Sequence, residues 1–253
     1  MINNDGWNYF NSDPAYADVL AERLAKSVEM DSARGLARIM QDRMSGDLSI
    51  IDFGSGPGHY LPVLRKTYTH GSLSYHGVDI IEASVETGNR HFDGDPAVRF
   101  ELGSVLDPAA SYAGEDTVIS ANTLPHVPSV EPLMRFVADT PDVRNFLFRM
   151  LIGRECVEIR KHLSEGDFDG LFERGYQHNN IYSVAYLQHL LGDDWNIEIL
   201  DDQVDFERLE GHSIPAQETD AFYGNRVSRA EGGKVFKGEV YMPWKFVLGS
   251  RRT

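Results

Sequence analysis

Three glycines spaced by single residues follow a short apolar run, and this feature constrains the chain more than any other. From residue 49 the sequence reads SIIDFGSGPGHY, in which the apolar run predicts a buried strand. Apolar residues return at helical spacing after Gly58, so the pattern predicts a strand, a glycine turn and a helix. Glycine lets a ligand approach the bare backbone, and the start of a helix offers unpaired N–H groups. The turn therefore predicts a site for a nucleotide-like ligand with a polar or negative group.

Short apolar segments alternate with helical patterns over residues 49–152. Ligands of the parallel, doubly covered sheet that this alternation predicts bind at the carboxyl ends of its strands. Asp79, Ser104 and Asn122 stand at or just after three such ends, so we expect them beside the glycine turn. The further strands are predicted at residues 73–79, 98–102, 116–122 and 145–152.

Asp79 ends the second predicted strand and follows the glycine turn by about 20 residues. An acidic residue at this place is expected to accept hydrogen bonds from a ribose, because two carboxylate oxygens match two vicinal hydroxyls. Ile80 follows it and is placed to pack on the face of an adenine ring. The two residues together predict a nucleoside site across from the turn.

The glycine spacing separates two classes of nucleotide site. Dinucleotide-binding turns read G-x-G-x-x-G, whereas this turn reads G-x-G-x-G and has His59 where the third dinucleotide glycine would fall. Preceded by Asp52 and Phe53, it resembles motif I of the class I S-adenosylmethionine (SAM)-dependent methyltransferases. The strand 116–122 and the following T-L-P-H-V-P, which contains His126, resemble motif IV of small-molecule methyltransferases.

This resemblance implies SAM as the cofactor and S-adenosylhomocysteine (SAH) as its product. It also implies a Rossmann-like, doubly wound α/β fold, with a mostly parallel seven-stranded sheet, an antiparallel last strand and an N-terminal helical extension. Many family members carry aspartate where Ser104 stands, so this chain departs from the family at the adenine amino contact. The residues implied in cofactor binding are Asp52, Gly54, Ser55, Gly56, Gly58, Asp79, Ile80, Ser104, Val105 and Asn122.

We expect residues 1–47 to form an N-terminal helical cap and residues 48–253 to form the SAM-binding domain. Within that domain, long segments at about 153–180 and 201–234 are predicted to shape the acceptor pocket, because long loops in compact domains are often lids or binding loops. Two interpretations of the cap stay open. Its helices either only cover the sheet, or its cluster of Trp7, Tyr9 and Phe10 closes over the pocket.

Histidines are the first candidates for chemistry, because a hydroxyl acceptor needs a base and imidazole has a suitable pKa. His126 follows a strand end that faces the expected cofactor, and His178 is the second candidate, lining the acceptor pocket from a loop. Local packing is the alternative interpretation for both and for His59. Arg149, inside the apolar strand 145–152, is predicted to pair with a carboxylate rather than to act in catalysis.

The composition of the chain narrows the classes of molecule that it is expected to bind. The formal net charge is −15, with 39 acidic and 24 basic residues, and no basic patch is interleaved with aromatics, so nucleic acid and anionic membranes are disfavoured. No apolar run approaches the ~18 residues of a membrane span, and residues 1–5 lack the features of a signal peptide, so a cytoplasmic protein is expected. Cys156 is the single cysteine, and no clustered His/Cys spacing predicts a metal.

The sequence thus favours a SAM-dependent methyltransferase with a small organic acceptor, and oxygen ahead of nitrogen as the methylated atom. The fourth strand does not end in the Asn-Pro-Pro-aromatic sequence of enzymes that methylate amide or adenine nitrogens. By analogy, secondary or sugar metabolism is the expected setting. Two alternatives stay open, a non-catalytic SAM-binding module and a nicotinamide-dependent oxidoreductase, and a homodimer is compatible with each of them.

Overall fold

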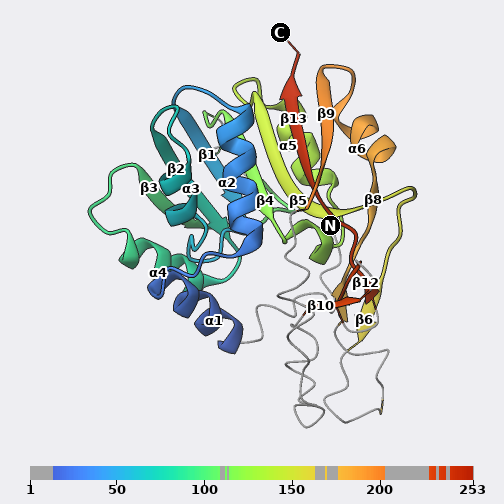
Figure 1. Cartoon of the computed structure of the whole chain (residues 1–253), viewed down its shortest axis with the longest axis horizontal. Helices are drawn as coiled ribbons and strands as arrows, with labels where there is room; N and C mark the ends of the chain where they lie inside the picture. Colours follow the sequence, from blue (N-terminus) through green and yellow to red (C-terminus); the bar gives the residue numbers. More distant parts are fainter. Residues whose placement is uncertain are drawn as a thin grey trace.

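Seven strands form a central sheet in the order β3-β2-β1-β4-β5-β13-β9 (Figure 1). β1, β2, β3, β4 and β5 pair in parallel, whereas β13 runs antiparallel to both of its neighbours, β5 and β9. The strands are β1 Leu48–Phe53, β2 Leu73–Asp79, β3 Val98–Leu102, β4 Thr117–Ala121, β5 Asn145–Gly153, β9 Trp195–Asp201 and β13 Trp244–Arg251. The computed structural model describes residues 14–108, 112, 114–162, 169, 176–202, 228–231, 234–237 and 240–252. The predicted mostly parallel α/β fold, with its antiparallel last strand, is confirmed.

Helices cover both faces of this sheet, because its strands are apolar on both sides. Ile50 and Ile51 are adjacent in β1 and point to opposite faces, and each belongs to a different buried cluster. One face carries α2 Asp31–Arg43, α3 Leu61–Thr67 and α4 Glu82–His91, and the other carries α5 Glu131–Asp139 and α6 Val184–Leu191. Ser183 accepts a hydrogen bond from the Tyr186 N–H and caps α6.

The N-terminal helix α1, Pro14–Ala25, lies at the end of the sheet where the parallel strands finish, beside α4 (Figure 1). Pro14 occupies its first position, where a missing N–H costs nothing. N-terminal helices thus precede the sheet as expected, whereas the boundary of the cap at residue 47 stays a prediction. The aromatic cluster of Trp7, Tyr9 and Phe10 lies outside the described residues.

Short strands extend the chain beyond the carboxyl end of β5. β6 Arg160–His162 pairs with β7 Tyr176–His178, so part of the expected 153–180 loop is a two-stranded ribbon. β8 Tyr182–Ser183 adds to β5 as an eighth strand of the main sheet. The strands β10 Ser228–Glu231, β11 Lys234–Lys237 and β12 Val240–Tyr241 form a small third sheet. Most of the second predicted loop, residues 203–227, lies outside the described part of the chain.

One predicted strand is two strands in the structure. The sequence of residues 240–248 predicts one strand, which Pro243 would place at an edge or a bulge, but the segment divides into β12 and β13 on either side of Met242 and Pro243. Proline has no N–H to offer a ladder, so the break falls there. β13 itself lies between β5 and β9, inside the sheet, and the Pro243 carbonyl accepts a hydrogen bond from Ile152 N at 3.0 Å.

Candidate functional site

An open cavity lies at the carboxyl ends of β1, β2, β3 and β4, beside the switch in strand order between β1 and β4. It holds about 860 Å³ of empty space, counting its mouth to solvent. Of the sequence-predicted residues, Gly54, Gly56, Asp79, Ile80, Ser104, Val105, Asn122 and His126 line it, whereas Asp52, Ser55, Gly58 and His178 do not. The structure therefore brings together residues from four separate strand ends, as the topology predicts.

Glycine is required at the turn positions by the backbone conformation and by close packing. Gly54, Gly56 and Gly58 have φ of 78°, 54° and 78°, a region that other residues rarely adopt. A Cβ on Gly54 would lie 2.0 Å from Thr123 Oγ1, and one on Gly58 would lie 2.4 Å from the ring of Phe100. Gly58 thus serves packing against β3 and does not border the cavity.

The N–H groups of this turn are already used within the protein. Gly54 and Ser55 donate to the Val78 carbonyl at 2.8 and 3.2 Å, and Gly58 donates to the Ser55 carbonyl. Gly56 N–H donates to Asp79 Oδ2 at 2.7 Å. This differs from the expectation that unpaired N–H groups of the turn would meet a negative ligand group, because β2 lies close enough to take them. The Ser55 hydroxyl is buried and donates to the Gly56 carbonyl.

Asp79 joins the turn to β2 and faces the cavity. Its Oδ2 accepts from Gly56 N–H, and its Oδ1 accepts from Ile81 N–H at 2.9 Å. Burial raises the pKa of its carboxyl, while these backbone donors oppose the shift. Each carboxylate oxygen accepts more than one hydrogen bond, so the group can hold the turn and also bind a ligand hydroxyl.

Asp52 lies below the turn without reaching the cavity, in contrast to its predicted place among the cofactor contacts. Its side chain is turned toward β2, where Oδ2 accepts a hydrogen bond from the Tyr75 hydroxyl. Complete burial raises the pKa of this carboxyl to about 7, the Tyr75 hydrogen bond opposes the rise, and nearby Asp79 adds to it. Asp52 is therefore a buried carboxyl without a cationic partner among the described residues.

Asn122 leaves β4 with φ of 67°, an uncommon value for a residue other than glycine. Both ends of its amide are held in place. Its Nδ2 donates to the Tyr60 hydroxyl at 2.8 Å, and its Oδ1 accepts from Arg149. Arg149 in turn binds Asp202 through two nitrogens, so the predicted carboxylate pairing of this arginine is confirmed. A buried polar chain thus fixes one wall of the cavity.

His126 lies at the end of the 3-10 helix Leu124–His126 and lines the same cavity. Its Nδ1 is 2.8 Å from the backbone carbonyl of His178, which can only accept. Nδ1 therefore carries a proton, and in the neutral ring Nε2 is the basic nitrogen.

His178 contributes its backbone rather than its ring to this arrangement. The side chain is 2 % exposed, stacks edge-on against Tyr176, and has no hydrogen bond on either ring nitrogen. Burial lowers its pKa. The ring alternates with Gln177 along β7, so the two side chains leave opposite faces of the ribbon. The second predicted base therefore lies away from the cavity.

Several cavity residues were missed by sequence reasoning. Tyr16, Leu20 and Arg23 come from one face of α1, and Met30 precedes α2. Their signal was present in the apolar periodicity of residues 16, 20 and 24, but that pattern does not say what the helix covers.

Among the described residues, no group of three or more His, Cys, Asp or Glu side chains could hold a metal ion. None of the described helices is long and apolar enough to cross a membrane.

Residues 50–140 match the family model described as a methyltransferase domain. The fold is shared with the putative methyltransferase of Haloferax volcanii in complex with the Trm112 methyltransferase activator (TM-score 0.58, 14 % identity, 99 % of both chains). It is also shared with magnesium protoporphyrin IX methyltransferase of Synechocystis with bound SAH (TM-score 0.53, 15 % identity, 96 % of this chain and 97 % of that one). A third is phosphoethanolamine N-methyltransferase 2 of Haemonchus contortus (TM-score 0.60, 13 % identity, 98 % of this chain and 60 % of that one). No curated protein sequence matches the chain.

Residues 50–140 thus resemble a methyltransferase domain, and the sheet order, with its cavity at the strand switch point, is the fold that solved SAM-dependent methyltransferases share.

Proposed function

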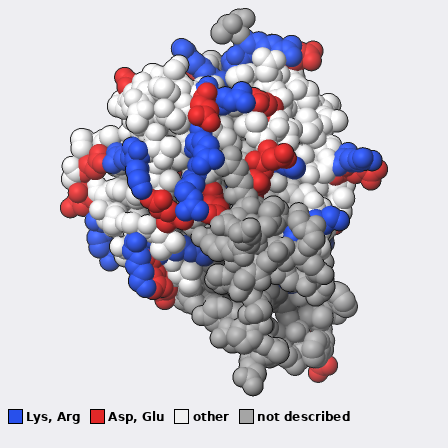
Figure 2. All heavy atoms as spheres, in the orientation of Figure 1, with Lys and Arg blue, Asp and Glu red and all other residues white. Residues whose placement is uncertain are grey.

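We propose that this chain transfers a methyl group from SAM to a small organic acceptor, with a hydroxyl oxygen as the favoured acceptor atom and secondary or sugar metabolism as its setting. The observation that carries the proposal is the convergence of the glycine turn, Asp79 and His126 on one cavity at the switch point of the sheet. On the face that Figure 2 draws, acidic and basic side chains are interspersed rather than gathered by sign, which favours a small acceptor over a polyanion.

The residues present fit SAM. Gly54 and Gly56 present bare backbone to the cavity, and Asp79 offers carboxylate oxygens to a ribose. Ile80 and Val105 provide apolar surface for an adenine, and Ser104 stands where a hydroxyl can meet its edge. When bound, the cofactor supplies a methyl group on a positively charged sulfur, which leaves as a neutral thioether. The chain has to hold donor and acceptor in line and to exclude water.

His126 is the base in this proposal. Its Nδ1 proton is committed to the His178 carbonyl, so Nε2 is the nitrogen that can take a proton from an acceptor hydroxyl. The residues that follow β7 also bind this wall of the cavity, since Asn180 N–H donates to the Pro125 carbonyl at 2.8 Å. The ribbon of β6 and β7 is thereby the part of the 153–180 segment that we assign to the acceptor side.

Isothermal titration with SAM, SAH and NAD tests the cofactor part of the proposal. Binding of SAM and SAH without NAD supports it, whereas binding of NAD alone would favour an oxidoreductase. A screen of hydroxylated acceptors, followed by SAH release, tests the transfer. Tight SAM binding with no transfer to acceptors of any class would leave a non-catalytic SAM-binding module.

Asp79→Asn is expected to weaken SAH binding by about tenfold or more, because a charged hydrogen-bond acceptor is replaced and the Gly56 contact is weakened. Titration calorimetry measures the change. Glu86→Gln removes the same charge from an exposed position on α4 and should leave the affinity within about twofold. Equal affinities of the two variants would remove Asp79 from the cofactor site.

His126→Gln is expected to lower kcat by about 10²–10⁴-fold on a hydroxyl acceptor, while SAH affinity is kept, because the loss is confined to proton transfer. The pH–rate profile should lose its lower limb as well. His189→Gln, on the exposed face of α6, is the control. A wild-type rate for His126→Gln would show that proximity alone is sufficient for this acceptor.

A further inference from the structure

Helix α1 forms a wall of the cavity as well as a cover for the sheet. Tyr16, Leu20 and Arg23 lie four and three residues apart, which places them on one face of the helix, and all three line the cavity. The contact is close, since a Cβ on Gly56 would lie 3.0 Å from Leu20 Cδ1. α1 therefore does more than cover the sheet, while closure of the pocket by the aromatic cluster stays a prediction, because that cluster lies outside the described residues. Figure 1 shows this helix beneath the carboxyl ends of the parallel strands.

Arg23 is the one permanently charged cation among the described residues that line this cavity. Its guanidinium makes one weak contact, with the sulfur of Met30 at 3.8 Å from Nη1. No carboxylate of the described residues lies within ion-pair distance of the guanidinium. The chain thus places a guanidinium at a cavity wall without the acidic partner that the buried Arg149 has.

His59 adds a second unsatisfied group at the same wall. Its ring lies next to Gly56, and its Nδ1 is buried without a hydrogen-bond partner. Burial, and after it the positive charge of Arg23, lower the pKa of this imidazole to about 3, so the ring is neutral. A neutral imidazole can donate to a carboxylate or accept from an ammonium group.

The ligand group that this wall suits is an anion, and SAM carries only one. Its sulfonium and ammonium groups are positive, so the methionyl carboxylate alone needs a cation. The glycine turn cannot receive that carboxylate through Gly54, Ser55, Gly56 or Gly58, because all four N–H groups are committed to protein acceptors. A buried or half-buried carboxylate without donors would be costly, so the donors must come from elsewhere.

We propose that Arg23 of α1, with His59 beside it, binds the methionyl carboxylate of SAM. This inference rests on the proposed function. It makes α1 part of the cofactor site, so that occupation of the site and docking of the N-terminal helix are coupled. Arg23 is thereby a specificity residue for the amino-acid end of the cofactor, whereas Asp79 acts at the nucleoside end.

Two ligands that differ only at that end test the assignment. SAH carries the carboxylate and ammonium groups, whereas 5′-methylthioadenosine keeps the nucleoside and the thioether but lacks both. Arg23→Gln is expected to weaken SAH binding by about tenfold or more and to leave 5′-methylthioadenosine within about twofold, as measured by titration calorimetry. Arg23→Lys should be intermediate for SAH, because lysine keeps the charge but loses the two-pronged geometry.

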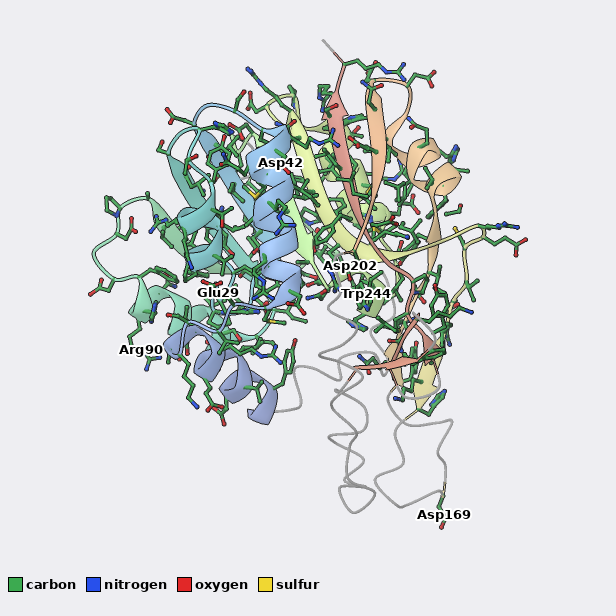
Figure 3. The ribbon with its side chains drawn as sticks, viewed as in Figure 1. Glu29, Asp42, Arg90, Asp169, Asp202 and Trp244 are labelled. Carbon is green, nitrogen blue, oxygen red and sulfur yellow. The ribbon has the colours of Figure 1, made fainter. Side chains whose placement is uncertain are left out.

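Arg90→Gln is the matched control, since Arg90 is an exposed cation on α4 that does not line the cavity (Figure 3). It should change neither affinity, and a loss equal to that of Arg23→Gln would show a general charge effect and overturn the assignment. Unchanged SAH binding in Arg23→Gln, or equal losses for both ligands, would also overturn it. Wild-type protein that binds neither ligand would instead refute the proposed function itself.

Discussion

Replacing Asp202 by alanine should lower the free energy of unfolding by about 3–5 kcal/mol, because it leaves the guanidinium of Arg149 buried and unpaired. The side chains of Arg149 and Asp202 are 10 % and 5 % exposed, and they are joined by two nitrogen–oxygen contacts. Arg149 also lies over the ring of Trp244, with Cζ 4.2 Å from its centroid. Asp202 and Trp244, which Figure 3 labels close together, thus both contact the arginine. Urea unfolding followed by circular dichroism measures the loss.

An exposed ion pair of the same sheet provides the control. Arg43 and Glu198 are joined by two contacts as well, but their side chains are 46 % and 43 % exposed. Glu198→Ala should cost less than about 1 kcal/mol, because water screens the pair and solvates the arginine that is left. The double variant Arg149→Met with Asp202→Leu should recover much of the stability lost in Asp202→Ala, since no buried charge remains. Equal costs for Asp202→Ala and Glu198→Ala would contradict burial as the cause.

The ion pair of Arg149 and Asp202 also affects the cavity, because Arg149 binds Asn122 in the cavity wall. The asparagine has a left-handed backbone, and Tyr60 and Arg149 hold its amide. A residue in such a conformation persists when its surroundings fix it. We therefore expect Asp202→Ala to weaken SAH binding in the protein that remains folded, although Asp202 does not line the cavity.

The order of elements could be predicted from the sequence because the signals for it are local. The alternation of strands and helices over 49–152 and the offset between Gly58 and Asp79 follow from periodicity and known topology. The alternation of elements and this offset were enough to predict that Asp79 lies beside the turn, where it accepts a hydrogen bond from Gly56 N–H.

The details that the sequence could not supply depend on tertiary contacts. β1 is buried on both faces, so no alternation of polar and apolar residues shows that Asp52 turns toward Tyr75 and away from the cavity. The donors of the glycine turn are taken by Val78 and Asp79, which are far along the chain. His178 was singled out for its ring, whereas its carbonyl is what meets His126.

Asp52→Asn should make the protein more stable relative to wild type as the pH rises, in contrast to most substitutions of a buried polar residue. The carboxyl titrates near 3.8 in an unfolded chain and near 7 in the folded one. The folded state therefore holds the proton more tightly, so the stabilisation is complete below about pH 3.8 and is lost as the pH rises through 7. A difference of about three pKa units corresponds to about 4 kcal/mol.

Asparagine removes this pH dependence, since it stays neutral and its carbonyl can still accept from the Tyr75 hydroxyl. Its amide N–H groups need partners in the same space, which costs about 1–3 kcal/mol at every pH. The quantity to measure is therefore the difference in the free energy of unfolding between Asp52→Asn and wild type. Between pH 4 and pH 8 this difference should move by about 2–4 kcal/mol in favour of Asp52→Asn. Urea unfolding at several pH values gives this difference directly.

Asp47→Asn is a control of opposite sign. Asp47 is exposed, and hydrogen bonds from the Ser72 backbone and hydroxyl lower its pKa. Its stabilisation is present above pH 3.8 and is lost as the pH falls through the lowered value, so Asp47→Asn should be less stable than wild type at neutral pH and approach it in acid. If the difference in the free energy of unfolding between Asp52→Asn and wild type stayed constant across this pH range, the carboxyl of Asp52 would be ionised in the folded protein. A cation or water not evident among its described neighbours would then compensate for its burial.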